Sequence, residues 1–364
     1  MVRRWMLVAG AGFVFASSCG DENALPAPPA ACDLPADFLS SWSNPAAAST
    51  CGPLKQRSGL GVRQGVAYFA TEKGICAIDA AGARLIAEHP LGFPPGGPWT
   101  ADDGLLAFDE VAVLLFPFPG GDPTIVATVA GANLEPSVMA AAYDGRFVYG
   151  TNALGLSDGA LWRIERNGLP EILSHLERDD GEADIVEKIV PAADHVDTSL
   201  RFGERLFRTD LATGVSRPLF DGEGTTYLLG GDGDSAYVRD AINHPDDPNA
   251  YWSDRNMSLF RIDGAGVKTR VLDGQTPLVP TAVMSIEGRV YAAGKLTYAG
   301  SKTYHGLVAL TPSGTGADLL ACVPAPGDSY SSLDTAVAIT VEGDFIYVLL
   351  AGRAYDFAIV RVAR

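Results

Sequence analysis

The sequence predicts an all-β fold made of a repeated unit, and three features of the chain indicate it. Turn dipeptides separate short alternating apolar runs, 41 of the 364 residues are glycine, and long apolar helical patterns are few. The clearest unit runs from Tyr143 to Ser174. It contains Asp144-Gly145 and Asn167-Gly168, which between alternating runs are strong hairpin signals. Similar units return about every 40 to 55 residues, the period of four-stranded propeller blades.

Seven copies of this unit can be counted. The first turn and its following strand return at residues 102–108, 231–238, 286–293 and 341–348, and the second hairpin returns at 75–86, 206–220, 259–272 and 307–320. An aromatic residue holds the same place in the second strand of six copies: Tyr68, Phe108, Tyr149, Tyr237, Tyr291 and Tyr347. The fourth copy, Asp184 to Phe220, lacks the turn signature and the aromatic residue. We therefore predict a seven-bladed β-propeller of four-stranded antiparallel blades.

The two ends of the propeller domain are expected to meet in the last blade. The last copy offers only three strands, at Thr335–Val341, Asp344–Leu350 and Phe357–Arg364. Completing this blade with an N-terminal strand would leave no open sheet edge. We expect Gly52–Arg57 to be that strand and to pair beside Ala358–Val362.

The segment before the repeats is predicted to direct and tether the chain. Residues 1–18 have the pattern of a signal peptide, with Arg3 and Arg4 before an apolar run that is too short to span a bilayer. Residues 19–50 are rich in proline, alanine, serine and acids, which predicts an extended tether. The propeller domain is then expected over residues 51–364.

Charge and cysteine content limit the partners and the compartment. The formal net charge is −17, so the surface repels phosphate backbones and no nucleic-acid partner is expected, whereas a basic ligand or a divalent cation is compatible. Beyond Cys19, four cysteines remain, an even number that suits an oxidising compartment. Of their three possible pairings, Cys32 with Cys51 is the most economical, which leaves Cys76 and Cys322. No metal-ligand spacing accompanies these cysteines, so no metal site is assigned to them.

Two long loops in neighbouring copies, residues 240–256 and 294–305, are the candidate ligand-binding site. Exposed aromatic rings beside carboxylates can stack on a sugar or an aromatic ligand and bond its hydroxyl groups. Alternatively, these rings fold back over the edge of the propeller and the acids are solvated. The candidate residues are His244, Asp246, Tyr251, Trp252, Asp254, Tyr298, Tyr304 and His305.

Other polar clusters give weaker signals. Asp232 and Asp234 resemble a calcium loop but fall where other copies have a tight turn. His195 and Asp197 lie in the aberrant fourth copy, where a departure from the repeat can mark function. No nucleophile elbow, zinc-protease motif or phosphate loop occurs in the chain.

The repeat is similar to that of predicted bacterial lipoproteins built as seven-bladed propellers, in the style of NHL and TolB repeats. The similarity covers Gly52 to Arg364 and is best over residues 144–173. The run from Ala16 to Cys19 also resembles a lipobox, although leucine usually stands where Ala16 does. The resemblance implies that Cys19 is acylated, and Gly20 after it implies delivery to the outer membrane of a Gram-negative bacterium. The alternative is a secretory signal cut near Ser18.

Two functional hypotheses follow. The first is a membrane-anchored, non-enzymatic propeller that binds a protein, a small molecule or a glycan through the two long loops. The alternative is a metal-assisted lyase or hydrolase that uses carboxylates and His195 or His305 at the channel mouth. Streptogramin lyase has a similar repeat style, but its metal and histidine motif cannot be mapped onto this chain. A scaffold in an envelope complex is a third possibility, which would need an exposed apolar patch.

Overall fold

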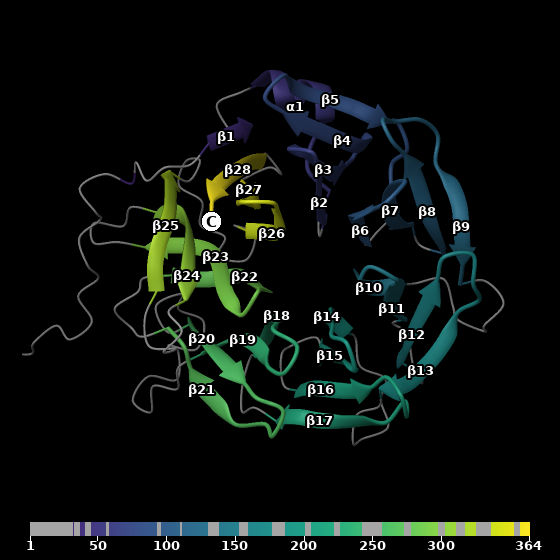
Figure 1. The fold of residues 1–364 in the computed structure, drawn as a ribbon, viewed down its shortest axis with the longest axis vertical. Coiled ribbons are helices and arrows are strands. Elements are labelled where there is room, and N and C mark those ends of the chain that lie inside the picture. The colour runs from purple at the N-terminus through teal and green to yellow at the C-terminus, as the bar shows by residue number, and fades with distance from the viewer. Residues whose placement is uncertain are drawn as a thin grey trace, which may run out of the picture.

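The computed structural model contains seven four-stranded antiparallel sheets arranged as a ring around a central channel (Figure 1), which confirms the predicted seven-bladed propeller. The structure describes residue 32 and residues 37–40, 45–55, 58–92, 96–109, 111–129, 138–152, 159–176, 186–200, 205–221, 226–241, 257–272, 278–297, 303–310, 317–324, 336–352 and 357–364. No helix within these ranges is long and apolar enough to cross a membrane.

In blades 1 to 6, the four strands follow the chain order from the channel outward (Figure 1). Blades 1 and 2 contain β2 (Leu60–Arg63), β3 (Val66–Thr71), β4 (Gly74–Asp79), β5 (Gly82–Ala87), β6 (Gly96–Ala101), β7 (Gly104–Asp109), β8 (Ala112–Pro117) and β9 (Thr124–Thr128). Blades 3 and 4 contain β10 (Val138–Tyr143), β11 (Phe147–Asn152), β12 (Gly159–Glu165), β13 (Glu171–Leu176), β14 (Val186–Pro191), β15 (His195–Leu200), β16 (Arg205–Asp210) and β17 (Ser216–Asp221). Blades 5 and 6 contain β18 (Tyr227–Gly231), β19 (Ala236–Ala241), β20 (Met257–Ile262), β21 (Lys268–Arg270), β22 (Leu278–Ile286), β23 (Arg289–Thr297), β24 (Thr303–Leu310) and β25 (Ala317–Pro324).

Blade 7 combines both ends of the domain. It contains β26 (Ala336–Glu342), β27 (Phe345–Ala351), β28 (Phe357–Ala363) and, outermost, β1 (Asp37–Ser40). An N-terminal strand therefore closes the ring, as predicted. A short helix, α1 (Pro45–Cys51), follows β1 and lies against blade 1.

The expected identity of the closing strand was wrong. The segment Gly52–Arg57 does not pair with β28; Leu54 forms an isolated bridge with Thr71 of β3 instead. Gly52 has a φ of 77°, which is outside the extended region, so the chain turns at the start of this segment instead of continuing as a strand. Residues 37–40 and 45–50, which were expected in the tether, are thus part of the ring.

The disulfides also differ from the favoured pairing. Cys32 is bonded to Cys322 of β25, and Cys51 is bonded to Cys76 of β4, so the expected Cys32–Cys51 bond was wrong. Cys32 ties the N-terminal segment to blade 6, β1 ties it to blade 7, and α1 ties it to blade 1. This segment therefore links blades 6, 7 and 1, on both sides of the blade in which the two ends of the domain meet. Disulfides of this kind persist in oxidising compartments, which is consistent with an extracytoplasmic protein.

An aspartate holds the turn between the first two strands of blade 3. The Asp144 carboxylate accepts hydrogen bonds from the backbone N–H groups of Arg146 and Phe147 at 2.8 and 2.7 Å. It also accepts one from the Tyr149 hydroxyl at 2.8 Å. Gly145 in this turn has a φ of 101°, which residues with a side chain rarely adopt. The turn aspartate and the tyrosine of the following strand, which recur in the sequence, are thus joined by a hydrogen bond in this blade.

Blade 5 repeats this unit. The Asp232 carboxylate accepts a hydrogen bond from the N–H group of Ser235 and another from the Tyr237 hydroxyl, each at 2.8 Å. Asp232 is therefore bound within the tight turn, which accounts for its place in the sequence.

Each interface between neighbouring blades contains one cluster of buried apolar side chains. The aromatic residues predicted to share one place are all buried in these clusters: Tyr68, Phe108, Tyr149, Tyr237, Tyr291 and Tyr347. The interface between blades 4 and 5 has the smallest cluster and no such aromatic residue. Polar side chains replace it there, as described below.

Candidate ligand-binding channel

Irregular pairing of the innermost strands shapes the central channel. In blades 2 to 7, the pairing of the first strand with the second shifts register, as in a β-bulge, close to the start of the first strand. A bulge adds an unpaired residue and turns side chains away from strict alternation. Consecutive residues of one innermost strand, such as Ala140, Ala141 and Ala142, all contribute to the channel wall, because the edge of that strand and not one of its faces lines the channel.

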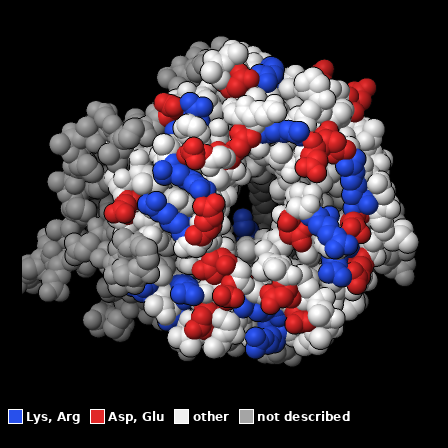
Figure 2. Space-filling view, in the orientation of Figure 1, with Lys and Arg blue, Asp and Glu red and all other residues white. Residues whose placement is uncertain are grey.

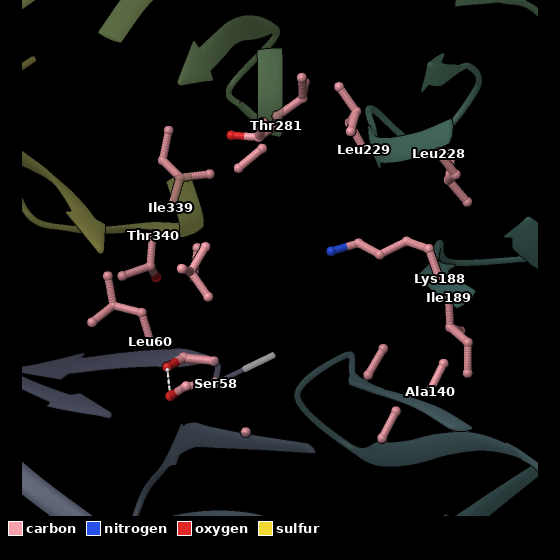
Figure 3. A pocket seen from close by; sticks show the side chains of 18 of the residues that line it. Ser58, Leu60, Ala140, Lys188, Ile189, Leu228, Leu229, Thr281, Ile339 and Thr340 are labelled. Carbon is pink, nitrogen blue, oxygen red and sulfur yellow. Dashed lines mark hydrogen bonds between the residues drawn. The ribbon is translucent and has the colours of Figure 1, made fainter. Parts of the chain in front are cut away.

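The channel encloses a cavity of about 520 Å³ to which all seven blades contribute described residues. Figure 2 shows the open mouth of the channel with acidic and basic residues interspersed around it. Just over half of the lining residues are aliphatic, although polar atoms make up more of the exposed wall than apolar atoms do. The other lining residues include Trp99, Tyr143, Tyr227 and Ser199, and the hydroxyl-bearing Ser58, Thr281 and Thr340 that Figure 3 labels. The volume of this cavity is within the range of small-molecule sites.

Two cationic residues line the cavity. Lys188 follows the bulge of β14, and Figure 3 shows its side chain extending into the open space, with the amino group directed toward the wall that carries Ile339 and Thr340. Arg239 of β19 is buried, and its guanidinium group lies 4.6 Å from the centre of the Tyr227 ring. Its Nη1 donates a hydrogen bond to the Pro280 carbonyl at 3.5 Å, across the interface between blades 5 and 6.

Most of the candidate residues predicted from the sequence lie outside the described residues. These are His244, Asp246, Tyr251, Trp252, Asp254 and Tyr298. Binding by them stays a prediction. Of the eight candidates, Tyr304 and His305 are described, and neither lines the cavity.

The expected loop at residues 294–305 was wrong over much of its length. β23 continues to Thr297 and β24 begins at Thr303, and Lys295 pairs with His305 across the two strands. His305 is only 2% exposed. Burial, and secondarily the charge of Lys295, lowers the pKa of this histidine to about 4. A neutral His305 inside the sheet of blade 6 cannot act as an exposed loop residue.

His195 and Asp197 belong to a buried ionic cluster between blades 4 and 5. The Asp197 carboxylate accepts two hydrogen bonds from the Arg208 guanidinium, at 2.7 and 2.8 Å. Burial alone would raise the pKa of Asp197, but the bonds from Arg208 and the contact with His195 hold it below its ordinary value. Arg208 also donates to the backbone carbonyl of Asp234 in blade 5 at 3.1 Å.

This cluster explains why the fourth copy departs from the repeat. Asp197 pairs across the sheet with Arg208 in the register in which Tyr149 pairs with Arg163 in blade 3. The aspartate therefore stands in the place of the missing aromatic residue and binds the arginine directly. Neither His195 nor Asp197 lines the channel cavity. Within the part of the chain that the structure describes, no group of three or more His, Cys, Asp or Glu side chains could hold a metal ion.

Sequence reasoning missed the channel residues Lys188 and Arg239. The residue that follows the inner-strand bulge is small in four blades: Ala140, Gly230, Ala282 and Ala338. At this position blade 4 has Lys188 and blade 2 has Trp99. An alignment of the inner strands could have revealed these two exceptions, but their position depends on bulges that only the paired strands define.

No protein-family model matches the chain, and no curated protein matches it. Among solved structures, oligogalacturonate lyase from Vibrio parahaemolyticus is similar over 91% of this chain and 93% of that one, with a TM-score of 0.60 and 10% identity. The WD40 domain of Neurospora crassa Pan2 is similar over 86% and 89%, with a TM-score of 0.52 and 12% identity. TolB from Acinetobacter baumannii matches over 70% and 60%, with a TM-score of 0.39 and 11% identity. At such identities, the likenesses to the lyase and to the WD40 domain support the propeller fold alone.

Proposed function

We propose that this protein is an extracytoplasmic binding module, anchored to a membrane through a lipid at Cys19, that takes a small ligand into its central channel. The observation that carries the proposal is the cavity of about 520 Å³, to which every blade contributes a wall. A ring of rigid strands holds these wall residues in place before a ligand arrives, which reduces the entropy lost on binding.

The chemistry of the wall favours binding over catalysis. The described residues that line the cavity include no histidine, cysteine, aspartate or glutamate. Those are the side chains that most often serve as general bases or metal ligands. The alternative of a metal-assisted lyase or hydrolase would need residues from outside this wall, since both His195 and His305 are buried elsewhere.

Two observations support the extracytoplasmic part of the proposal. The paired cysteines suit an oxidising compartment. The lipobox-like run that ends at Cys19 supplies the anchor, and Gly20 favours delivery to the outer membrane of a Gram-negative bacterium. Because Cys32 is bonded to Cys322, the part of the chain left to act as a tether ends at residue 31.

The channel is tested with N-phenyl-1-naphthylamine, an uncharged dye whose fluorescence rises in apolar sites. We expect saturable binding to the purified protein and energy transfer from Trp99, which lines the cavity. Ala338→Trp adds a large side chain to the wall and should abolish binding, whereas Val267→Trp, on an exposed turn of blade 5, should not. Trp99→Phe should lower the energy transfer without preventing binding. This change reports the position of the dye independently of the Ala338→Trp variant. Undiminished binding to a folded Ala338→Trp variant would disprove the channel as the site.

The anchor is tested by labelling a Gram-negative host that expresses the chain with radioactive palmitate. We expect label on the wild-type protein and its recovery with the membrane fraction. Cys19→Ser should remove both, while Ser17→Ala serves as the matched control and should keep both. Unlabelled wild-type protein in the soluble fraction would indicate an ordinary secretory signal instead.

A further inference from the structure

The outer hairpins of blades 3, 4 and 5 each expose one large aliphatic residue at the same place. Leu169, Val215 and Val267 each follow the glycine of the turn between the third and fourth strands. The three residues are 86%, 60% and 57% exposed. One exposed aliphatic residue is ordinary on a protein surface. The repetition of one place in three neighbouring blades instead forms a row along an arc of the ring (Figure 1).

Close packing of the turns fixes this row on the outer rim. A Cβ added at Gly214 would lie 2.6 Å from the Leu173 carbonyl oxygen of blade 3. A Cβ added at Gly266 would lie 2.5 Å from the Leu219 carbonyl oxygen of blade 4. Each turn therefore lies directly against the outer strand of the preceding blade, and the exposed valine that follows the glycine is held in a defined position.

The same hairpins of blades 4 and 5 are basic. Residues 205–221 and 257–272 contain six arginine and lysine residues and three aspartates, a net charge of +3 in a chain whose net charge is −17. Two of these aspartates, Asp210 and Asp263, each accept hydrogen bonds from two backbone N–H groups of their own turn. The corresponding hairpins of blades 1 to 3 are neutral or negative, over residues 74–87, 112–128 and 159–176.

Three exposed arginines of the basic hairpins have no acidic partner among the described residues. Arg217, Arg261 and Arg270 donate hydrogen bonds to backbone carbonyl or serine hydroxyl oxygens, all of which are neutral. By contrast, the exposed Arg84 and Arg146 are each paired with an acid. A guanidinium has five N–H groups, so each of the three arginines keeps donors for an anion outside the protein.

The N-terminal segment enters the domain beside this arc. Cys32, bonded to Cys322 of β25, packs against the apolar cluster that contains Val271 and Leu272, which directly follow β21. Cys19 precedes Cys32 by 13 positions. Thirteen residues span at most about 45 Å when fully extended. A lipid at Cys19 would therefore hold the outer edge of blades 5 and 6 within that distance of a bilayer.

We infer that the arc of blades 4 and 5 is a docking surface for an anionic lipid bilayer. Arg217, Arg261 and Arg270 contact the headgroup phosphates, and Val215 and Val267 enter the boundary between headgroups and acyl chains. Basic residues beside exposed aliphatic ones are the combination that binds such interfaces. The inference rests on the lipid anchor of the proposed function for the nearness of the bilayer.

This surface also determines how the ring is oriented. The rest of the molecule is strongly acidic, so an anionic bilayer repels it and attracts this arc. A bilayer that meets the outer hairpins does not cover the channel, which the innermost strands surround. Docking of this kind is reversible and is weakened by salt, so the lipid still supplies the stable attachment.

The test measures co-sedimentation of the Cys19→Ser protein, which carries no lipid, with vesicles. We expect binding to vesicles of phosphatidylglycerol and phosphatidylcholine in equal parts and little binding to phosphatidylcholine alone. Arg217→Gln with Arg270→Gln should weaken the binding by on the order of twentyfold, because each basic residue near an anionic surface contributes about fivefold. Val215→Asn with Val267→Asn should weaken it by on the order of tenfold, because apolar area is no longer buried.

The matched control changes blade 1, which lies across the ring from blades 4 and 5 (Figure 1). Lys73→Gln with Arg84→Gln removes an equal charge from exposed positions there and should leave the binding nearly unchanged. Equal binding to both kinds of vesicle, or binding that the arginine pair does not alter, would overturn the docking surface. Binding that needs the arginines but not the valines would also overturn it, since the arc would then attract an anion without entering a bilayer.

The outcomes separate this inference from the proposed function. Palmitate label on the wild-type protein, without vesicle binding by the Cys19→Ser protein, would disprove the docking surface and leave the anchor in place. Vesicle binding without label would disprove the anchor and leave the docking surface in place. The dye experiment tests the channel independently of both. Melting temperatures of all variants establish that each is folded.

Discussion

At the scale of single residues, the interface between blades 4 and 5 shows how a buried carboxylate can take the place of an aromatic residue of the repeat. Tyr149 and its cross-strand partner Arg163 stand in blade 3, and Tyr347 and Arg361 stand in blade 7. In blade 4 a carboxylate replaces the tyrosine and binds the arginine through two short bonds. A buried carboxylate is strongly unfavourable without such a partner. Arg208 supplies that partner to Asp197. The pair lies at the interface that has the smallest cluster of buried apolar side chains.

His195 is expected to make the stability of the protein depend on pH. Its Nδ1 lies 2.6 Å from Asp194 Oδ1 and its Nε2 lies 3.7 Å from Asp197 Oδ2. Asp197 and then Asp194 raise the pKa of His195 above its ordinary value of about 6.5. The protonated form is thus favoured by folding, so its stabilisation is fully present below about pH 6.5 and is lost as the pH rises through the folded-state pKa.

His195→Gln should therefore flatten the decrease in the free energy of unfolding between about pH 5.5 and pH 8.5. Urea unfolding at a series of pH values measures this slope. His175→Gln, at an exposed position of β13, is the matched control and should keep the wild-type slope. An unchanged slope in His195→Gln would show that the two carboxylates do not couple to this histidine.

At the scale of secondary-structure elements, local signals predicted the hairpins well. The Asp144-Gly145 turn forms because its aspartate and its glycine satisfy the turn within a few residues of chain. Such signals do not depend on distant partners, so they can be recognised in the sequence. The same local signal identified Asp232 with a turn rather than with a calcium loop.

Elements that depend on a partner strand were not predictable in the same way. The chain at residues 294–297 and 303–305 reads as a polar loop, yet it extends β23 and β24, because Leu296 is fully buried and pairs with Tyr304. The inner-strand bulges are a second case. A bulge exists only relative to the neighbouring strand, so nothing in the local sequence distinguishes the channel-lining residues that follow it, such as Lys188.

At the scale of the whole molecule, polar contacts join the blades near their turns. Arg166 of blade 3 binds Asp103 of blade 2 at 2.7 Å, and Arg364 of blade 7 binds Glu287 of blade 6 at 2.9 Å. These pairs are exposed, so each contributes little to stability alone. They place basic side chains next to acidic ones on the surface of a molecule whose net charge is −17.

The Cys32–Cys322 disulfide is expected to be the main covalent lock of the ring. It joins residues 290 positions apart, whereas Cys51 and Cys76 are 25 apart. A cross-link that closes a longer loop removes more entropy from the unfolded chain, and the loop-entropy relation gives a difference of roughly 2 kcal/mol.

The double variant Cys32→Ala with Cys322→Ala should therefore lose more free energy of unfolding than Cys51→Ala with Cys76→Ala. Denaturant unfolding under oxidising conditions compares the two. An equal loss, or a larger loss for the short loop, would mean that β1 and its pairing with β28 close the ring without help from the longer disulfide.

The sequence by itself determined the number of blades, their antiparallel hairpins, the aromatic residue that six blades share and closure of the last blade by an N-terminal strand. These features depend on the alternation of apolar residues and on the turn residues, both of which recur in each copy. Seven copies, each imperfect, therefore support the same prediction. The tertiary structure decided which segment closes the ring, which cysteines pair and which side chains line the channel. Those depend on contacts between residues as far apart as Cys32 and Cys322 and on bulges that only paired strands create. For the same reason, the two cations of the channel became visible only in the folded ring.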